Sequence, residues 1–314
     1  MTVATGLRAV EGTFSHRALF YWDEAGYVSS TVRFVLDGLA AGEAVAVAVP
    51  ARWLRRLEDA LGPAAAQVAL IDIQESGRNP ARIIPEFHAF LDEHAPGSVR
   101  VVGEPVWPGR SEEEYPACVQ HEAMVNLTFA HRRVTFLCPY DVGALGPEVV
   151  RDAETTHPLL AEADTDRVRP SPRYSPELAY DRYNEPLSAP PEAFVVPFDV
   201  ETLSKARRVA AEFAARAGIA EDRLADVMLA VGEICANSVQ HGGGRGELAV
   251  WTTDDGVVCQ VTDQGRFTER LAGCVPVSPY QQGGRGLLLV NKVADLVRTY
   301  TAPDGLTTHI HVCR

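Results

Sequence analysis

The sequence predicts two domains: an N-terminal α/β domain with a mainly parallel sheet, and a C-terminal α+β domain. The chain has 314 residues and 46% hydrophobic content, enough for two cores of ordinary size. Strand-like and helix-like segments alternate in the first half, whereas two helices precede a run of strands in the second. Prolines recur amid polar residues between Arg151 and Glu192, a pattern typical of a linker.

The elements of the first half follow one another in strict alternation. Short β-branched runs predict strands at 44–49, 67–73, 99–105 and 133–141, and helical periodicity predicts helices at 26–41, 51–61, 80–94 and 111–131. Because parallel strands need crossover connections, this order favours a parallel sheet covered by helices on both faces.

The elements of the second half come in a different order. Helices are expected at 200–217 and 222–240, strands at 246–253 and 256–263, a helix near 284–294, and closing strands at 295–302 and 305–312. Helices gathered against one face of a mostly antiparallel sheet make this half α+β.

Charge and cysteine usage exclude several classes of function. The net charge of −13 disfavours direct binding of nucleic acid, which needs a basic surface. The six scattered cysteines include no C-x-x-C pair, so buried reduced thiols and a cytoplasmic location are expected. No leader peptide and no apolar run of the ~20 residues that span a bilayer are visible. The lysines, Lys205 and Lys292, both lie in the second half, so the first half has no P-loop.

A row of polar residues crosses an otherwise apolar helix in the stretch "VGEICANSVQHG". Glu233, Asn237 and His241 are four residues apart and therefore share one helix face. Taken alone, such a row is more typical of a solvated stripe on an amphipathic helix.

Two later segments change that interpretation. The strand ending "CQVTDQG" carries Asp263 to a turn at Gly265, where a carboxylate can accept from an exocyclic amine close to the backbone. The segment "QQGGRGLLLVNKVAD" then places Gly283, Gly284 and Gly286 before a helix, where backbone amides can hold phosphates.

These three segments, in this order, resemble the N, G1 and G2 boxes of the GHKL (Bergerat) ATPases. The segment from about 194 to 314 is most similar to the anti-sigma factor serine kinases of the RsbW/SpoIIAB type. The resemblance implies ATP and Mg²⁺ as cofactors, with Asn237 on Mg²⁺, Asp263 on adenine, Glu233 as general base, and a threonine of the last strand, Thr307 or Thr308, at the adenine site.

The chain departs from the family pattern near the phosphates. The lid "RFTERLAGCVPVSPYQQ" has no lysine, so Arg285 is either a phosphate contact or a solvated loop residue. His241 either touches nucleotide or closes its helix. Arg207 matches an arginine that the family uses at its partner surface. The partners implied are an alternative sigma factor, a STAS-domain anti-anti-sigma protein and a second copy of the chain.

The first half resembles the MEDS sensory domain over about residues 14–158. The motifs that carry the resemblance include "SGRNPARIIPEF" and "GEPVWPGRSEEEYPACVQHEAMVNLTFA". It implies a RecA-like fold without a phosphate loop and an unidentified small-molecule signal. The residues near element ends that could bind this signal are His16, Tyr21, Glu104, Trp107, His121 and Glu122, each of which could equally anchor a loop. A metal site from His16, His121 and a carboxylate stays open as an alternative.

Together these patterns predict a cytoplasmic transcription-regulatory switch of the stress-response type. A sensory domain (1–158) and a linker (159–193) would precede an ATPase domain (194–314) that binds a sigma factor and phosphorylates a serine or threonine of its STAS partner. One alternative is a catalytically inactive scaffold that binds ATP or partners without phosphate transfer. The other is an enzyme acting on a small molecule in the first half, where no nucleophile and base pair is evident.

Overall fold

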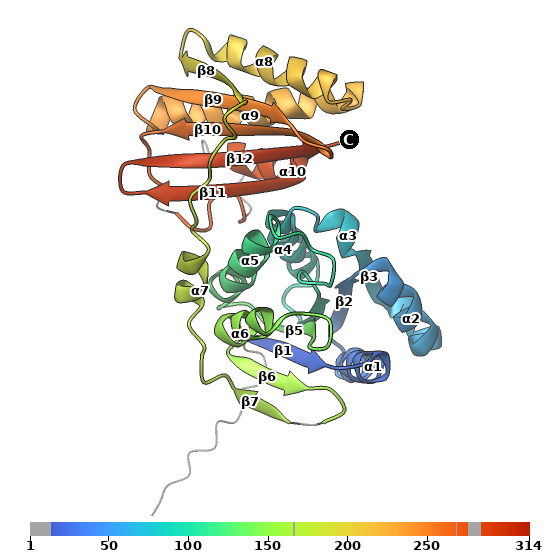
Figure 1. Ribbon diagram of the computed structural model, residues 1–314. Helices are drawn as coiled ribbons and strands as arrows, with labels where there is room; N and C mark the ends of the chain where they lie inside the picture. Colours follow the sequence, from blue (N-terminus) through green and yellow to red (C-terminus); the bar gives the residue numbers. More distant parts are fainter. Residues whose placement is uncertain (1–13, 166, 268, 276–283) are drawn as a thin grey trace, which may run out of the picture. The chain divides into compact units, whose positions relative to one another are not determined.

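The computed structural model describes residues 14–165, 167–267, 269–275 and 284–314. The chain forms two compact units whose limits interleave along the sequence (Figure 1). The first unit contains Met1–Gln74, Ala89–Arg110 and Val125–Ala179, and the second contains Glu75–His88, Ser111–Met124 and Tyr180–Arg314. Two segments of the N-terminal half therefore belong to the unit that holds the C-terminal half.

The first unit is built on a seven-stranded sheet of order β3-β2-β4-β5-β1-β6-β7. All neighbours are parallel except β6 and β7, which pair antiparallel. The strands are β1 (Ser15–Tyr21), β2 (Ala44–Val49), β3 (Val68–Asp72), β4 (Val99–Gly103), β5 (Val134–Asp141), β6 (Leu159–Glu162) and β7 (Val168–Pro170). The mainly parallel sheet predicted from strand–helix alternation is confirmed.

Helices cover both faces of this sheet. Helices α1 (Glu24–Ala40) and α2 (Ala51–Leu61) pack on the face that carries Leu19 and Leu137. The opposite face carries His16 and Phe136 and meets the end of α5 (Tyr115–Thr128) and α6 (Pro147–Thr156). A sheet buried on both faces explains why β2 reads "AVAVAV" rather than alternating apolar and polar residues.

The second unit contains a five-stranded antiparallel sheet of order β11-β12-β10-β9-β8. Its strands are β8 (Phe194–Asp199), β9 (Arg245–Thr252), β10 (Gly256–Asp263), β11 (Leu296–Ala302) and β12 (Gly305–Cys313). Helices α8 (Leu203–Arg216), α9 (Glu221–His241) and α10 (Gly286–Val293) gather behind one face (Figure 1), and a single apolar core joins them to β9, β10 and β12. This is the α+β arrangement that the sequence predicts.

Several elements were not predicted. Strands β1 and β8 are two of these, and β8 contains Pro197, which is tolerated because β8 is an edge strand. The segment 159–193, expected to be a linker, supplies β6, β7 and the short helix α7 (Pro176–Arg182). The predicted helix 80–94 begins with a 3-10 turn, η2 (Pro80–Arg82), before α4 (Ile83–Glu93), and it follows a single helical turn, α3 (Ile73–Ser76).

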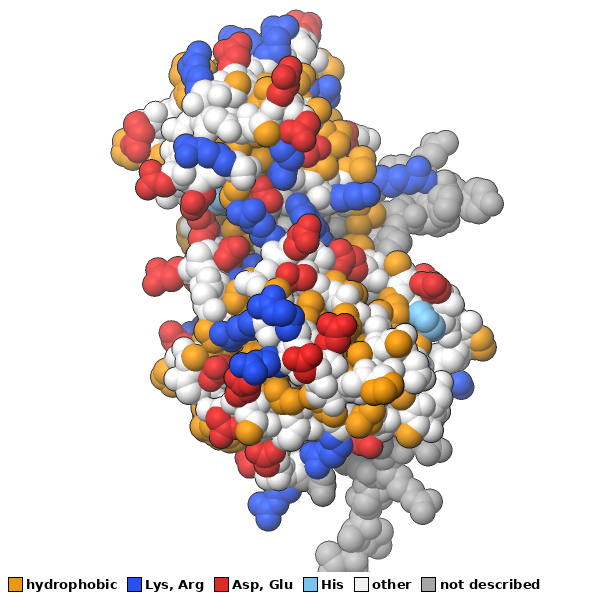
Figure 2. Space-filling view, turned by 90° about the vertical axis from the view of Figure 1, so that its right-hand side faces the viewer, with side chains coloured by type: hydrophobic (Ala, Val, Ile, Leu, Met, Phe, Trp, Pro, Cys, Tyr) orange, Lys and Arg blue, Asp and Glu red, His pale blue; other side chains and the backbone are white. Residues whose placement is uncertain are grey.

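The distribution of charged side chains and the state of the cysteines are the next features of the structure. On the face shown in Figure 2, acidic and basic side chains are interspersed, with apolar side chains between them. The cysteines are free; five of them are buried, and Cys313 is half-buried. Among the described residues, no helix combines the length and apolarity needed to cross a membrane.

Candidate functional site

A cavity of about 960 Å³ opens in the second unit between α9, α10 and the ends of β10 and β12. Most of the residues that the sequence singles out in the C-terminal half line it. They are Glu233, Asn237, His241, Asp263, Gly265, Gly284, Arg285, Gly286 and Thr308. The residues come from segments up to 75 positions apart, and the antiparallel sheet brings those segments to one edge.

Helix α9 supplies the polar row. Its opposite side is fixed in the core by buried residues that include Val227, Val231 and Cys235. The row of Glu233, Asn237 and His241 therefore lines the cavity, with Glu233 and Asn237 half-buried and His241 exposed. His241 is the last residue of α9 and also lines the cavity.

Asp263 is held at the end of β10 by two donors. The Ser238 hydroxyl donates to its Oδ2 at 2.5 Å, and the Gly265 backbone N–H donates to its Oδ1 at 2.6 Å. A Cβ on Gly242 would lie 2.5 Å from the same carboxylate, and one on Gly265 would lie 2.7 Å from it. Both positions therefore require glycine, and the carboxylate is fixed in orientation before any ligand arrives.

The N-terminus of α10 lies against Glu233. A Cβ on Gly286, the first residue of the helix, would lie 2.5 Å from Glu233 Oε2, so a side chain here would displace the Glu233 carboxylate. Gly284 has φ of +80°, a left-handed conformation that favours glycine. The first N–H groups of a helix lack intrahelical acceptors and attract anions, so this end can hold phosphate beside a carboxylate. Gly283 lies outside the described residues.

Strand β12 distinguishes the two threonine candidates. Thr308 lines the cavity and is 4% exposed, whereas Thr307 points to the other face, as alternation along a strand requires. Of the two threonines, Thr308 lines the cavity and Thr307 does not.

The cationic residues of the cavity are arginines. Arg285 and Arg266 line it, and no lysine does among the lining residues that the structure describes. Arg266 donates through Nη2 to the Pro303 carbonyl oxygen. Sequence reasoning missed Arg266 and Gln240 as lining residues, although Arg266 follows Gly265 directly in the quoted lid segment.

Arg207 does not line the cavity. Its guanidinium lies on α9, where a Cβ on Gly232 would come within 2.5 Å of Arg207 Nε. This Nε is buried and has no hydrogen-bond partner among the described residues. Gly232, the residue directly before Glu233, therefore leaves room for the side chain of Arg207 because it has no side chain of its own.

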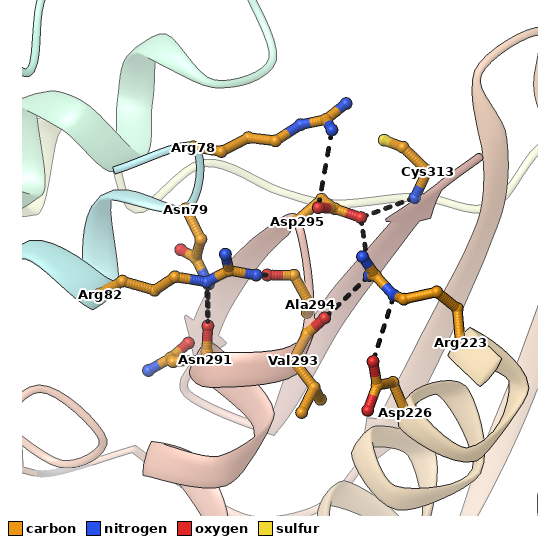
Figure 3. Close-up of polar contacts among 10 residues, drawn as sticks. All are labelled: Arg78, Asn79, Arg82, Arg223, Asp226, Asn291, Val293, Ala294, Asp295 and Cys313. Atoms are coloured by element: carbon orange, nitrogen blue, oxygen red, sulfur yellow. Dashed lines mark hydrogen bonds and ion pairs between the residues drawn. The ribbon is translucent and has the colours of Figure 1, made fainter. Parts of the chain in front are cut away.

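The C-terminus of α10 is anchored by a segment of the N-terminal half (Figure 3). Asn79 Nδ2 and Arg82 Nε each donate to the Asn291 carbonyl oxygen at 3.0 Å, and Arg82 Nη2 donates to that of Ala294 at 2.6 Å. The last carbonyls of a helix lack intrahelical donors and form its negative end, which a guanidinium stabilises. Sequence reasoning missed this contact because its partners are more than 200 residues apart.

Asp295, two residues after this helix, is the second point of attachment (Figure 3). Its Oδ2 accepts from Arg223 Nη2 at 3.1 Å and from the Cys313 N–H at 2.8 Å, and Arg78 lies 3.7 Å from its Oδ1. Arg223, on α9, also donates to the Val293 carbonyl oxygen at 3.0 Å. Since the Asp295 side chain is 7% exposed, its charge is compensated inside the protein and not by water.

The six candidate sensory residues do not all share one site. His16 is fully buried, with its ring nitrogens 3.2 Å from Asn126 Oδ1 and 3.3 Å from Cys138 Sγ. Trp107 stacks under Arg110, whose guanidinium carbon lies 3.7 Å from the ring centroid. His121 and Glu122 are buried on the part of α5 that belongs to the second unit. His121 there lines a small cavity of about 80 Å³ together with Asn291.

Tyr21 and Glu104 do lie in one cluster of the first unit. Tyr27 donates to Glu104 Oε2 at 3.1 Å, and the Tyr21 and Tyr27 ring centroids are 4.9 Å apart. Glu104 is fully buried, and its Oε1 has no hydrogen-bond partner among the described residues. Burial raises the pKa of Glu104 to about 8, opposed by the Tyr27 hydrogen bond. The carboxyl is therefore mostly protonated at pH 7.

The raised pKa of Glu104 predicts a pH-dependent stability of the first unit. The folded state binds the proton more tightly than the unfolded state, whose pKa is near 4.5, so the unfolding free energy falls as pH rises from 4.5 towards 8. The slope is at most about 1.4 kcal/mol per pH unit. A Glu104→Gln variant is expected to lose this slope, which denaturant unfolding at pH 5, 6.5 and 8 measures. Parallel pH profiles for both proteins would contradict the assignment.

Comparison with known proteins divides the chain into two parts. Residues 15–158 match the MEDS family, described as the MEthanogen/methylotroph, DcmR Sensory domain. Residues 196–312 match the histidine kinase-like ATPase domain. The serine-protein kinase RsbW of Halalkalibacterium halodurans (strain ATCC BAA-125 / DSM 18197 / FERM 7344 / JCM 9153 / C-125) is 33% identical over 114 residues, which cover 32% of this chain and 70% of the relative.

Proposed function

Because the chain belongs through its C-terminal domain to the family of the serine-protein kinase RsbW, and carries a MEDS domain before it, we propose that it is an ATP-dependent regulatory switch. In this proposal the C-terminal domain binds ATP and Mg²⁺ and sequesters an alternative sigma factor. It also phosphorylates a serine or threonine of a STAS-domain anti-anti-sigma protein. The MEDS domain adjusts these activities in response to a small-molecule signal.

The cavity supports the nucleotide part of the proposal. Asp263, fixed by Ser238 and Gly265, offers a carboxylate oxygen to an exocyclic amine at one end. The N-terminus of α10 at Gly286 offers unpaired N–H groups to phosphates at the other. Asn237 lies between them on α9 and would hold Mg²⁺ through its amide oxygen, a hard ligand of the kind this ion prefers. Bound Mg²⁺ would offset the phosphate charges beside Glu233.

Glu233 supports the transfer part of the proposal. Its carboxylate lies against Gly286 and therefore beside the end of α10 where the terminal phosphate is expected. There it can take the proton from a serine or threonine hydroxyl as that oxygen bonds to the γ-phosphorus and ADP leaves with the bridging oxygen. Arg285 lines the same cavity and can contribute positive charge to the phosphates. The convergence of Glu233, Asn237 and Gly286 in one cavity is the observation that carries the proposal.

An Asn237→Ala variant tests the nucleotide part. We expect calorimetry to give an ATP affinity at least about tenfold weaker than that of the wild type when Mg²⁺ is present, because one oxygen ligand of the ion is lost. Without Mg²⁺ the two proteins should differ little. Met228→Ala is the matched control, since Met228 is an exposed residue of α9 that does not line the cavity. Equal affinities of Asn237→Ala and wild type in Mg²⁺ would contradict the assigned role.

The anchored end of α10 supports control from the first unit. Asn79 and Arg82 lie in Glu75–His88, a stretch preceded directly by Gln74 and followed directly by Ala89 of the first unit. A change that shifts this stretch would shift α10, and with it Gly284, which precedes the helix. A signal can act in this way only if it binds two arrangements of the protein with different affinity.

A scaffold that binds ATP and partners without transferring phosphate is the second candidate function. The same cavity would serve it, and the distinction rests on whether Glu233 acts as a base. Labelled phosphate transfer from ATP to a panel of STAS-domain proteins from the same genome distinguishes the two. ATP binding without transfer to any partner would favour the scaffold.

A further inference from the structure

Strand β12 presents two buried histidines on the face opposite the nucleotide cavity. Thr308 and Ile310 point to the cavity and the core, and the alternation of the strand turns His309 and His311 the other way. Their exposures are 5% and 8%. Neither histidine takes part in the function proposed above.

A carboxylate of the same unit completes a group of three. Glu113, in the segment Ser111–Met124, has its Oε1 3.4 Å from His311 Nε2. Each of these residues offers one potential ligand atom, and the three atoms, from Glu113, His309 and His311, lie within 4.8 Å of one another. His311 Nε2 is buried and has no hydrogen-bond partner among the described residues. A buried ring nitrogen therefore faces a carboxylate oxygen without bonding to it.

Both imidazoles carry a ring nitrogen whose lone pair can bind a metal ion, and the Glu113 carboxylate lies beside them.

The distances fit a tetrahedral ion. Bonds of about 2.0–2.1 Å to nitrogen and oxygen place neighbouring ligand atoms of a tetrahedral zinc site about 3.3–3.4 Å apart. The separation of His311 Nε2 and Glu113 Oε1 is 3.4 Å. Gln260 orients the ring of His309. The ring Nε2 lies 2.8 Å from Gln260 Oε1, an acceptor of the kind that orients metal-ligating histidines.

The charged side chains around the site are mixed. Arg298 is paired with Glu185 at 3.2 Å, and Asp295 is paired with Arg223 at 3.1 Å, so their charges are offset. Glu113 is therefore the carboxylate that a dication at this position would meet.

We propose that Glu113, His309 and His311 form a zinc-binding site with a fourth position open to solvent. Two histidines and one carboxylate are a ligand set that suits Zn²⁺. Bound zinc would fasten the segment Ser111–Met124 to β12. Because Thr308 directly precedes His309 on that strand and lines the nucleotide cavity, the ion would also restrain one wall of the cavity.

Zinc titration of the full-length protein tests the site. After removal of metal with a chelator, competition with a chromophoric zinc indicator is expected to show one tight site per chain. Co²⁺ substituted for zinc should give the intense visible absorption of a tetrahedral centre. Glu113→Gln is the most informative variant, since Glu113 is 57% exposed and its replacement should leave the fold intact. We expect it to weaken zinc binding by about 10- to 100-fold.

Two further variants make the result specific. His311→Ala should abolish the tight site, and His131→Ala should retain it, because His131 is an exposed histidine of the first unit. None of the variants alters a cysteine, so a loss of zinc in Glu113→Gln and His311→Ala cannot come from thiol ligands. Equal zinc affinity in the wild type and in both of these variants would overturn the proposal. The result does not depend on whether the chain is a kinase.

Discussion

A Glu233→Gln variant is expected to bind ATP as tightly as the wild type and to transfer phosphate about 10²–10⁴-fold more slowly. Glutamine keeps the size and the contact with Gly286 but cannot accept the proton of an attacking hydroxyl. The nucleotide contacts of Asp263 and of the helix terminus are unchanged. The measurement is single-turnover transfer of labelled phosphate to a STAS-domain partner, with ATP affinity measured on the same preparation.

The two readouts separate the competing interpretations of the site. Normal binding with slow transfer assigns the carboxylate to the chemical step. Normal binding with normal transfer would show that Glu233 is not the base. Met228→Ala, on the same helix but outside the cavity, should match the wild type in both measurements. If the wild type binds ATP but transfers phosphate to no partner, the scaffold function is the better description.

The sequence anticipates this site because its chemistry is local. Glu233 and Asn237 follow helical spacing, Asp263 ends a strand before a glycine, and Gly286 opens a helix, so each can be recognised in a window of a few residues. The choice between Thr307 and Thr308 is of another kind. It depends on the register of β12 against β10, which places Thr308 opposite Val261 of the core.

The sequence does not anticipate contacts between residues that are far apart along the chain. Asn79, Arg82 and Glu113 lie in the half that resembles a sensory domain, and nothing near them in the chain indicates that they bond to α10 or approach β12. Strand β8 was missed for a different reason, since a short edge strand containing Pro197 gives only a weak local signal. Packing and topology decide these features, and periodicity does not report them.

An Arg82→Ala variant is expected to lower both the stability of the second unit and its affinity for ATP. The guanidinium makes two hydrogen bonds, to the carbonyl oxygens of Asn291 and Ala294, and bonds from a charged donor contribute about 1.5–3 kcal/mol each when they are well formed. Since Arg82 is only partly buried, we expect a loss of about 2–3 kcal/mol in unfolding free energy. Denaturant unfolding measures this.

The effect on ATP follows from the length of α10. This helix has eight residues, and its first residue, Gly286, lies against Glu233 at the expected phosphate end. When the far end loses its anchor, a small shift of the whole helix displaces the N–H groups that would face the phosphates. A coupling of 1–3 kcal/mol is typical between linked sites, so ATP affinity should fall about tenfold.

Lys292→Ala is the matched control for Arg82→Ala. It removes one positive charge from the last turn of the same helix, but Lys292 is exposed and should contribute less than about 1 kcal/mol. If Arg82→Ala loses stability but keeps wild-type ATP affinity, the anchor is structural and the first unit must influence the site by another path. If affinity falls in Arg82→Ala and not in Lys292→Ala, the stretch Glu75–His88 reaches the nucleotide site through α10, because no cavity residue has been changed.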